Sequence, residues 1–171
     1  MLIALLLAPL PARAGKGAKV KLRPGSATKL RLRRGRAAAL DLGSNSVKLI
    51  VTNRRGKVVY DAKLNTALGQ GVGADKLLPS ANQKRVMSAL RKLVQAAEKH
   101  KVPAKKIRLV ATAAVRNATG KERSGAKLGE HKLSGKTFLS QLAKDFGIGR
   151  AAVLSGKQEA EHGYRGAIIA W

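Results

Sequence analysis

The stretch Ala39–Val51 reads ALDLGSNSVKLIV and decides the fold that this sequence predicts. Two apolar runs flank a short polar connection, which is typical of two β-strands joined by a tight turn. The connection contains one carboxylate, one glycine and three small polar side chains, at Asp41, Gly43, Ser44, Asn45 and Ser46. An acid at this point needs an explanation, because the chain has 35 Lys and Arg residues against 9 Asp and Glu.

The residue types of this turn suit a phosphate site. Gly43 has no side chain, so the backbone there can approach an oxyanion closely. Residues 44–46 offer side-chain donors and consecutive backbone N–H groups, which can form an anion-binding nest. Asp41 at the strand end can hold a divalent cation, which would screen its charge from the phosphate. The residues alone leave a second interpretation open, namely an Asx-type hairpin turn that binds no ligand.

Length and composition exclude several classes of protein. The 171 residues suit one domain, or one domain with a tail. The chain has no cysteine, which excludes disulfide scaffolds, thiolate metal sites and cysteine nucleophiles. The formal net charge of +26 favours attraction to polyanions such as polyphosphate, nucleotides, nucleic acid or anionic lipid. A general bias of the genome toward Arg, Lys and Ala explains the same charge, so the charge alone does not identify a partner.

The first 36 residues differ from the rest of the chain. Residues 1–14, MLIALLLAPLPARA, combine an apolar run with an A-x-A cleavage pattern, which is typical of a secretory signal peptide. A signal peptide would imply a secreted or periplasmic protein, whereas an artefact of an upstream start codon would imply a cytoplasmic one. The run is too short for a transmembrane span. Residues 15–36 contain no acid and are expected to form a flexible basic tail, whose contacts with nucleic acid or another polyanion would be nonspecific.

Apolar periodicity predicts an α/β domain with a mixed sheet. Three strands joined by short turns form an antiparallel start, and later strands alternate with helices in βαβ crossovers. Ser80 and Gln83 are predicted to form a capping box at the start of the first helix. The expected strands cover residues 37–42, 47–52, 57–64, 106–111 and 151–154, and the expected helices cover residues 80–100, 113–118 (a helix or a turn), 137–146 and 157–171.

Three motifs, in this order, resemble the exopolyphosphatase/guanosine pentaphosphate phosphohydrolase (Ppx/GppA) family. The first is D-x-G-S-N-S at Asp41–Ser46. The second, VATAAVRNA at Val110–Ala118, is similar to the family's A-T-x-A-x-R-x-A, and the third, LSGKQEAE at Leu154–Glu161, to its I-S-G-x-E-E-A-R. Leu68–Gly71 also resembles the family's L-G-x-G loop. The resemblance covers about residues 37–166 and implies an actin-like lobe of the ribonuclease-H type.

The resemblance also implies roles for individual residues. Gly43–Ser46 would bind phosphate, together with Thr112 and the permanently charged guanidinium of Arg116. Glu159 falls on the family's catalytic glutamate, which positions or deprotonates the attacking water. Asp41 would help to hold Mg²⁺ or another divalent cation. The residues alone leave other interpretations open, in which Arg116 is a surface charge and Glu159 is an acid that stabilises the start of a helix.

The implied activity is hydrolysis of terminal phosphoanhydride bonds in polyphosphate or, with less support, in guanosine pentaphosphate. Residues 37–171 would form the N-terminal lobe of such an enzyme, with a homodimer as one way of completing the cleft. Three positions depart from the family pattern, at Gly120, Gln158 and Glu161. The family's D-x-G-G-G-S-x-E loop and second lobe do not occur in these 171 residues. The competing expectation is therefore a catalytically inactive lobe that binds polyphosphate or nucleic acid through its charge.

Overall fold

The computed structural model describes residues 35–169 of the chain. The predicted signal peptide at residues 1–14 and nearly all of the predicted basic tail lie outside this range. Among the described residues, no helix has both the length and the apolar character that a membrane span requires.

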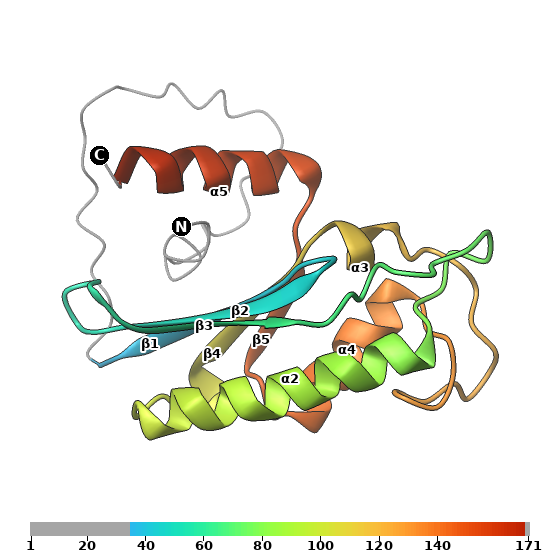
Figure 1. Cartoon of the computed structure of the whole chain (residues 1–171), viewed down its shortest axis with the longest axis horizontal. Coiled ribbons are helices and arrows are strands. Elements are labelled where there is room, and N and C mark those ends of the chain that lie inside the picture. The colour runs from blue at the N-terminus through green and yellow to red at the C-terminus, as the bar shows by residue number, and fades with distance from the viewer. Residues whose placement is uncertain (1–34, 170–171) are drawn as a thin grey trace, which may run out of the picture.

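Five strands form one mixed sheet in the order β3-β2-β1-β4-β5 (Figure 1). The antiparallel part consists of β1 (Ala37–Leu42), β2 (Ser46–Thr52) and β3 (Val58–Asn65). The parallel part adds β4 (Ile107–Ala111) beside β1 and then β5 (Arg150–Val153) at the edge. Short turns join the antiparallel strands, and helical crossovers join the parallel ones. The predicted antiparallel start followed by βαβ crossovers is therefore confirmed.

Helices lie on both sides of this sheet. Figure 1 shows α2 (Ser80–Lys99) and α4 (Gly135–Asp145) on one side and α5 (Gly156–Ile169) on the other. Two shorter elements flank β4, namely the 3₁₀ turn η1 (Ala104–Lys106) before it and α3 (Ala113–Asn117) after it. The predicted helix boundaries differ from these bounds by no more than two residues within the described range, which is the usual uncertainty of helix ends.

The core lies between the sheet and the pair α2 and α4. Alternate residues of the strands point toward these helices, because successive side chains of a strand face opposite ways. Leu40, Leu49 and Leu109 occupy such positions in three adjacent strands, and each is at most 1% exposed. The helices contribute Leu90 and Phe138, which are fully buried. Apart from Phe138 the buried core is aliphatic, as the low aromatic content of the sequence predicts.

The predicted capping box at the start of α2 is wrong. The N-cap position is Pro79, and no side chain caps the helix there. Gln83 is instead fully buried, and its Nε2 donates to the backbone oxygens of Leu78 and His131, each at 2.8 Å. Its Oε1 accepts a hydrogen bond from the amide of Gly129, also at 2.8 Å. A buried amide needs partners, and two of the three, at residues 129 and 131, are distant in sequence, so local pattern could not reveal this role.

Candidate functional site

The predicted site residues gather at the carboxyl ends of three strands. Asp41 lies near the end of β1, and the phosphate turn, defined as Gly43–Ser46, connects β1 to β2. Thr112 follows β4, and Arg116 lies in α3 directly after it. Glu159 lies in the first turn of α5, which follows β5. Because β1, β4 and β5 are adjacent and parallel, these three segments reach the same edge of the sheet.

The carbonyl groups of the phosphate turn are held by a loop that comes from elsewhere in the chain. Ser44 O accepts a hydrogen bond from Gly69 N at 2.9 Å. Asn45 O accepts two, from the amides of residues 66 and 67, at 2.9 and 3.0 Å. Within residues 35–169, the N–H groups of Ser44 and Asn45 themselves donate no backbone or side-chain hydrogen bond. Two consecutive amide donors are therefore left for an anion.

Glycines permit the close contacts that shape this turn. Gly43 N donates to Ser46 O at 3.0 Å, and a Cβ added at Gly43 would lie only 3.3 Å from that oxygen. A Cβ added at Gly69 would lie 3.3 Å from the Cβ of Ser44 and 3.5 Å from that of Ala114. A side chain at either position would push the turn away from its neighbours. These two glycines therefore keep the two amide donors in place.

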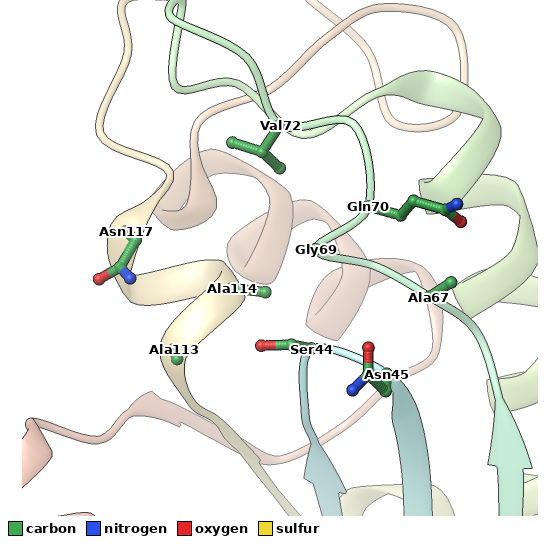
Figure 2. Close-up of a pocket in the computed structure, with 9 residues that line it drawn as sticks. All are labelled: Ser44, Asn45, Ala67, Gly69, Gln70, Val72, Ala113, Ala114 and Asn117. Carbon is green, nitrogen blue, oxygen red and sulfur yellow. The ribbon is translucent and has the colours of Figure 1, made fainter.

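A cavity of about 540 Å³ opens beside the phosphate turn (Figure 2). Ser44 and Asn45 form one wall, the loop of residues 67–72 forms the second, and α3 forms the third. The polar side chains that line it are neutral, and Gln70 and Asn117 add two amide groups to those of the turn. In Figure 2 the side chain of Ser44 points toward α3. The cavity offers hydrogen-bond donors without a fixed charge.

Asp41 is a buried carboxylate without a hydrogen bond on one of its oxygens. The residue is 7% exposed, and within the described residues Oδ1 has no partner. Burial raises the pKa of Asp41 above its ordinary value of 3.8. The opposite charge of Lys48, which pairs with Asp41 from the adjacent strand β2, lowers this pKa, and the like charge of Glu159 raises it. An unpaired buried carboxylate near a second acid is costly unless a cation joins them.

The residues present fit a divalent cation. Mg²⁺ in phosphate sites is commonly held by one or two carboxylates, with phosphate oxygens and water completing the octahedron. Asp41 supplies a free oxygen of the required type, and Glu159 is close enough for its charge to act on Asp41. Across residues 35–169, no group of three or more His, Cys, Asp or Glu side chains forms a ready metal cluster. The site thus suits a cation that arrives with phosphate better than one held by the protein alone.

Arg116 and Glu159 form an ion pair with each other. Arg116 Nη1 lies 3.1 Å from Glu159 Oε2 and also donates to the carbonyl of Leu154 at 2.7 Å. Both side chains are about one-third exposed. A guanidinium has five N–H donors, and these two contacts use a single nitrogen. The structure therefore brings together two predicted site residues, a base from α3 and an acid from α5, that lie 43 positions apart in sequence.

Two of the predicted phosphate ligands are buried. Ser46 is 8% exposed and Thr112 is 5% exposed. Thr112 N donates to Leu42 O at 3.2 Å, and Thr112 O accepts from Arg116 N at 2.9 Å. These backbone contacts fix the end of β1 to the start of α3. Phosphate binding by Ser46 and Thr112 stays a prediction.

Sequence reasoning missed the residues that hold the loop behind the phosphate turn. Asn82, in the first turn of α2, is buried, and its Nδ2 donates to the carbonyls of Leu68 and Gln70. Arg85 Nε donates to Thr66 O at 2.9 Å. The available signal is a polar pair spaced three residues apart on a helix, which places both on one side. That signal is weak, because such pairs are common on exposed helix faces.

Comparison with known proteins identifies relatives of this fold. The sequence model described as the Ppx/GppA phosphatase family matches residues 49–171. A crystal structure of the type II variant of the Aquifex aeolicus Ppx/GppA phosphatase superimposes with a TM-score of 0.56 at 22% identity, covering 71% of this chain and 36% of that one. An exopolyphosphatase from Cytophaga hutchinsonii gives a TM-score of 0.57 at 22% identity, covering 74% and 36%. No curated protein matches the sequence.

These similarities confirm the expected fold class, an α/β lobe with a mixed sheet of the kind found in this phosphatase family. The chain spans about one-third of the length of the solved structures that it matches. The identities are low enough that the structural likeness speaks for the fold alone.

Proposed function

The chain belongs to the Ppx/GppA phosphatase family. We propose that residues 37–171 correspond to the N-terminal, phosphate-binding lobe of such an enzyme and act in the hydrolysis of terminal phosphoanhydride bonds. Inorganic polyphosphate is the proposed substrate, with the 5′ end of guanosine pentaphosphate as the less favoured one. The net charge of +26 supports a polyanionic substrate, because a strong positive field concentrates such chains near the protein.

One observation carries this proposal, namely that a short segment combines unengaged amides at Ser44 and Asn45 with the unpartnered carboxylate oxygen of Asp41. Amide donors complement phosphoryl oxygens. Asp41 complements a divalent cation, and the cation in turn complements phosphate. A ligand-free hairpin turn also leaves the amides of its two central residues unengaged, but it has no need of a buried, unpartnered acid. The arrangement therefore favours the phosphate site over the ligand-free turn.

In the proposed reaction the N–H groups of Ser44 and Asn45 bind the terminal phosphoryl group and hold it in line with an attacking water. The Glu159 carboxylate accepts the proton of that water as its oxygen bonds to phosphorus. The bridging P–O bond breaks, and its electron pair leaves with the shortened phosphate chain. Asp41, with oxygens of the terminal phosphoryl group, would hold Mg²⁺. When bound, the cation neutralises charge on the bridging and terminal oxygens.

In this scheme the ion pair between Arg116 and Glu159 belongs to the protein without substrate. Glu159 Oε2 is engaged while Arg116 Nη1 lies 3.1 Å from it, so this oxygen is not available to an attacking water. Phosphate oxygens would compete with Glu159 for the guanidinium, since Arg binds phosphate and carboxylate through the same donors. Substrate binding would then move Arg116 onto phosphate and leave Glu159 free to orient water.

The test is phosphate release from long-chain polyphosphate in the presence of Mg²⁺, measured for the wild-type chain and for Glu159→Gln. The matched control is Glu98→Gln, which makes the same charge change on an exposed position of α2. We expect release by the wild type and the control, and a loss of at least a hundredfold in Glu159→Gln, in line with the usual effect of removing a general base.

Polyphosphate binding is measured for the same three proteins. Absence of phosphate release from all of them, with tight and salt-sensitive binding, would overturn the hydrolytic proposal in favour of a polyanion-binding lobe. Equal release by the wild type and Glu159→Gln would overturn the role of Glu159.

A further inference from the structure

A second cavity, of about 510 Å³, borders α3 and shares Arg116 with the candidate site. Three cationic side chains line it, those of Arg116, Lys121 and Lys136, against the single acid Glu122. Its lining includes no aromatic residue. The first cavity, beside the phosphate turn, has no charged residue in its lining. The two cavities therefore suit different chemistry, and the second suits an anion.

The loop of residues 118–134 that forms much of this cavity is fixed at its base. Gln83, which is fully buried, hydrogen-bonds to His131 O and Gly129 N, each at 2.8 Å. Gln141 on α4 donates to Ala126 O at 3.0 Å and accepts from Leu128 N at 2.7 Å. Two buried or half-buried amides thus bind four backbone groups of one loop. Such a loop can present charges in a defined arrangement, which lowers the entropy cost of binding a ligand.

The rim of the cavity is equally constrained. Gly120 N donates to Lys76 O at 2.9 Å, and Gly135 N donates to Ala118 O at 2.7 Å. A Cβ added at Gly120 would lie 1.8 Å from the carbonyl oxygen of Asp75, so only glycine fits this backbone position. These contacts fix the backbone immediately before Lys121 and immediately before Lys136. The departure from the family pattern at Gly120 therefore has a steric cause.

The acid in the cavity is already engaged. Glu122 accepts hydrogen bonds from Ser134 N at 3.0 Å and from the hydroxyl of Thr137 at the start of α4. These bonds lower the pKa of Glu122 below its ordinary value of 4.5, so its charge is fixed at neutral pH. The carboxylate thus accepts hydrogen bonds from polar groups at the start of α4, where a negative charge is also favourable. The positive charges of Lys121 and Lys136 are then left to face the cavity.

We propose that this second cavity, bounded by Arg116, Lys121 and Lys136, is a phosphoryl subsite that binds inner groups of a condensed phosphate chain. This inference rests on the proposed function, because it extends the same substrate beyond its terminal group. The absence of aromatic side chains from the lining favours bare phosphate over nucleotides or nucleic acid, whose bases are usually stacked on such rings.

The shared residue links the subsite to the acid of the candidate site. A phosphoryl group in the cavity would compete with Glu159 for the guanidinium of Arg116, which now contacts Glu159 at 3.1 Å. Binding of inner phosphoryl groups would thereby weaken the ion pair that holds Glu159. A long phosphate chain can occupy both the phosphate turn and the second cavity, whereas orthophosphate occupies one of them. Long chains should therefore bind more tightly than orthophosphate.

The test uses tripolyphosphate, added without divalent cation to the full ¹⁵N-labelled chain. We expect amide shifts in residues 119–122 and 134–136 as well as in the phosphate turn. Calorimetry should give an affinity about tenfold lower for the double variant Lys121→Gln/Lys136→Gln, a loss of about 1.4 kcal/mol, because two charged contacts to phosphate are removed. The control, Lys92→Gln/Lys99→Gln, removes the same charge from exposed positions of α2 and should lose much less.

Shifts confined to the phosphate turn, or equal affinity of the two double variants, would overturn the subsite. The amide spectrum of each variant reports whether it is folded. A chain that releases no phosphate but shows the expected shifts and the selective loss of affinity would refute the hydrolytic function and leave the subsite standing.

Discussion

Replacement of Asp41 by Asn should stabilise the ligand-free protein. The change keeps the shape of the side chain and removes a charge that is 7% exposed and unpartnered on Oδ1. A buried polar group without a partner costs about 1–3 kcal/mol, and more when it is charged. The amide still lacks one partner and loses the attraction of Lys48, so the expected net gain is at the low end, about 1 kcal/mol. For a chain of this size that gain raises Tm by roughly 2–4 °C.

The stabilisation by Asp41→Asn should depend on pH. Burial raises the pKa of Asp41, so the folded state holds this proton more tightly than the unfolded state does. Stability from this group is therefore present at low pH and is lost as pH rises through the folded pKa. The difference in Tm between Asp41→Asn and the wild type should be full at pH 7 and should shrink as the pH falls toward 4.

Thermal unfolding monitored by circular dichroism measures this difference, with and without Mg²⁺ and phosphate. Added together, these ligands should raise the Tm of the wild type but not that of Asp41→Asn. Asp61→Asn, at an exposed position of β3, is the control for the loss of one acid from a basic protein. A lower Tm for Asp41→Asn than for the wild type at pH 7 without ligand would refute the reasoning.

Two further predictions concern the loop that follows α3. Gly120→Ala should destabilise the protein by about 3 kcal/mol or prevent folding, because its Cβ would lie 1.8 Å from Asp75 O. Urea unfolding measures this loss. Gly73→Ala is the control and should be nearly neutral, because its Cβ would have its nearest contact at 3.9 Å. The second prediction concerns Glu122, whose pKa is lowered, so its stabilising effect should be present above pH 4.5 and lost as the pH falls below that value. Glu122→Gln should therefore reduce the fall of Tm at acid pH. The control, Glu130→Gln, should leave that fall unchanged.

The regular elements could be predicted because each has a local cause. Alternating or continuous apolar residues specify β1 to β3 regardless of what packs against them. The apolar spacing of Val86, Leu90 and Leu93 likewise specifies α2, and all three are buried. The crossover pattern then follows from the order of strands and helices. The mixed sheet was therefore accessible from the sequence.

The parts that could not be predicted depend on contacts between distant segments. Gln83 sits three residues after a serine, which suggests a capping box, yet its amide binds a loop nearly fifty positions later. The pairing of Arg116 with Glu159 and the anchoring of the phosphate turn by residues 66–69 have the same character. Sequence identified the groups, but only the fold determines which of their donors and acceptors remain unengaged.

The unengaged groups also explain why so basic a chain has an acid, Asp41, near the end of β1 and two residues before the phosphate turn. Phosphate alone would meet the amides of Ser44 and Asn45 but also the negative charges of Asp41 and Glu159. A cation alone would satisfy Asp41 and leave the amides without an acceptor. Phosphate and cation together complement every one of these groups at once. The site is therefore expected to bind the two cooperatively, with the buried carboxylate making phosphate affinity depend on the cation.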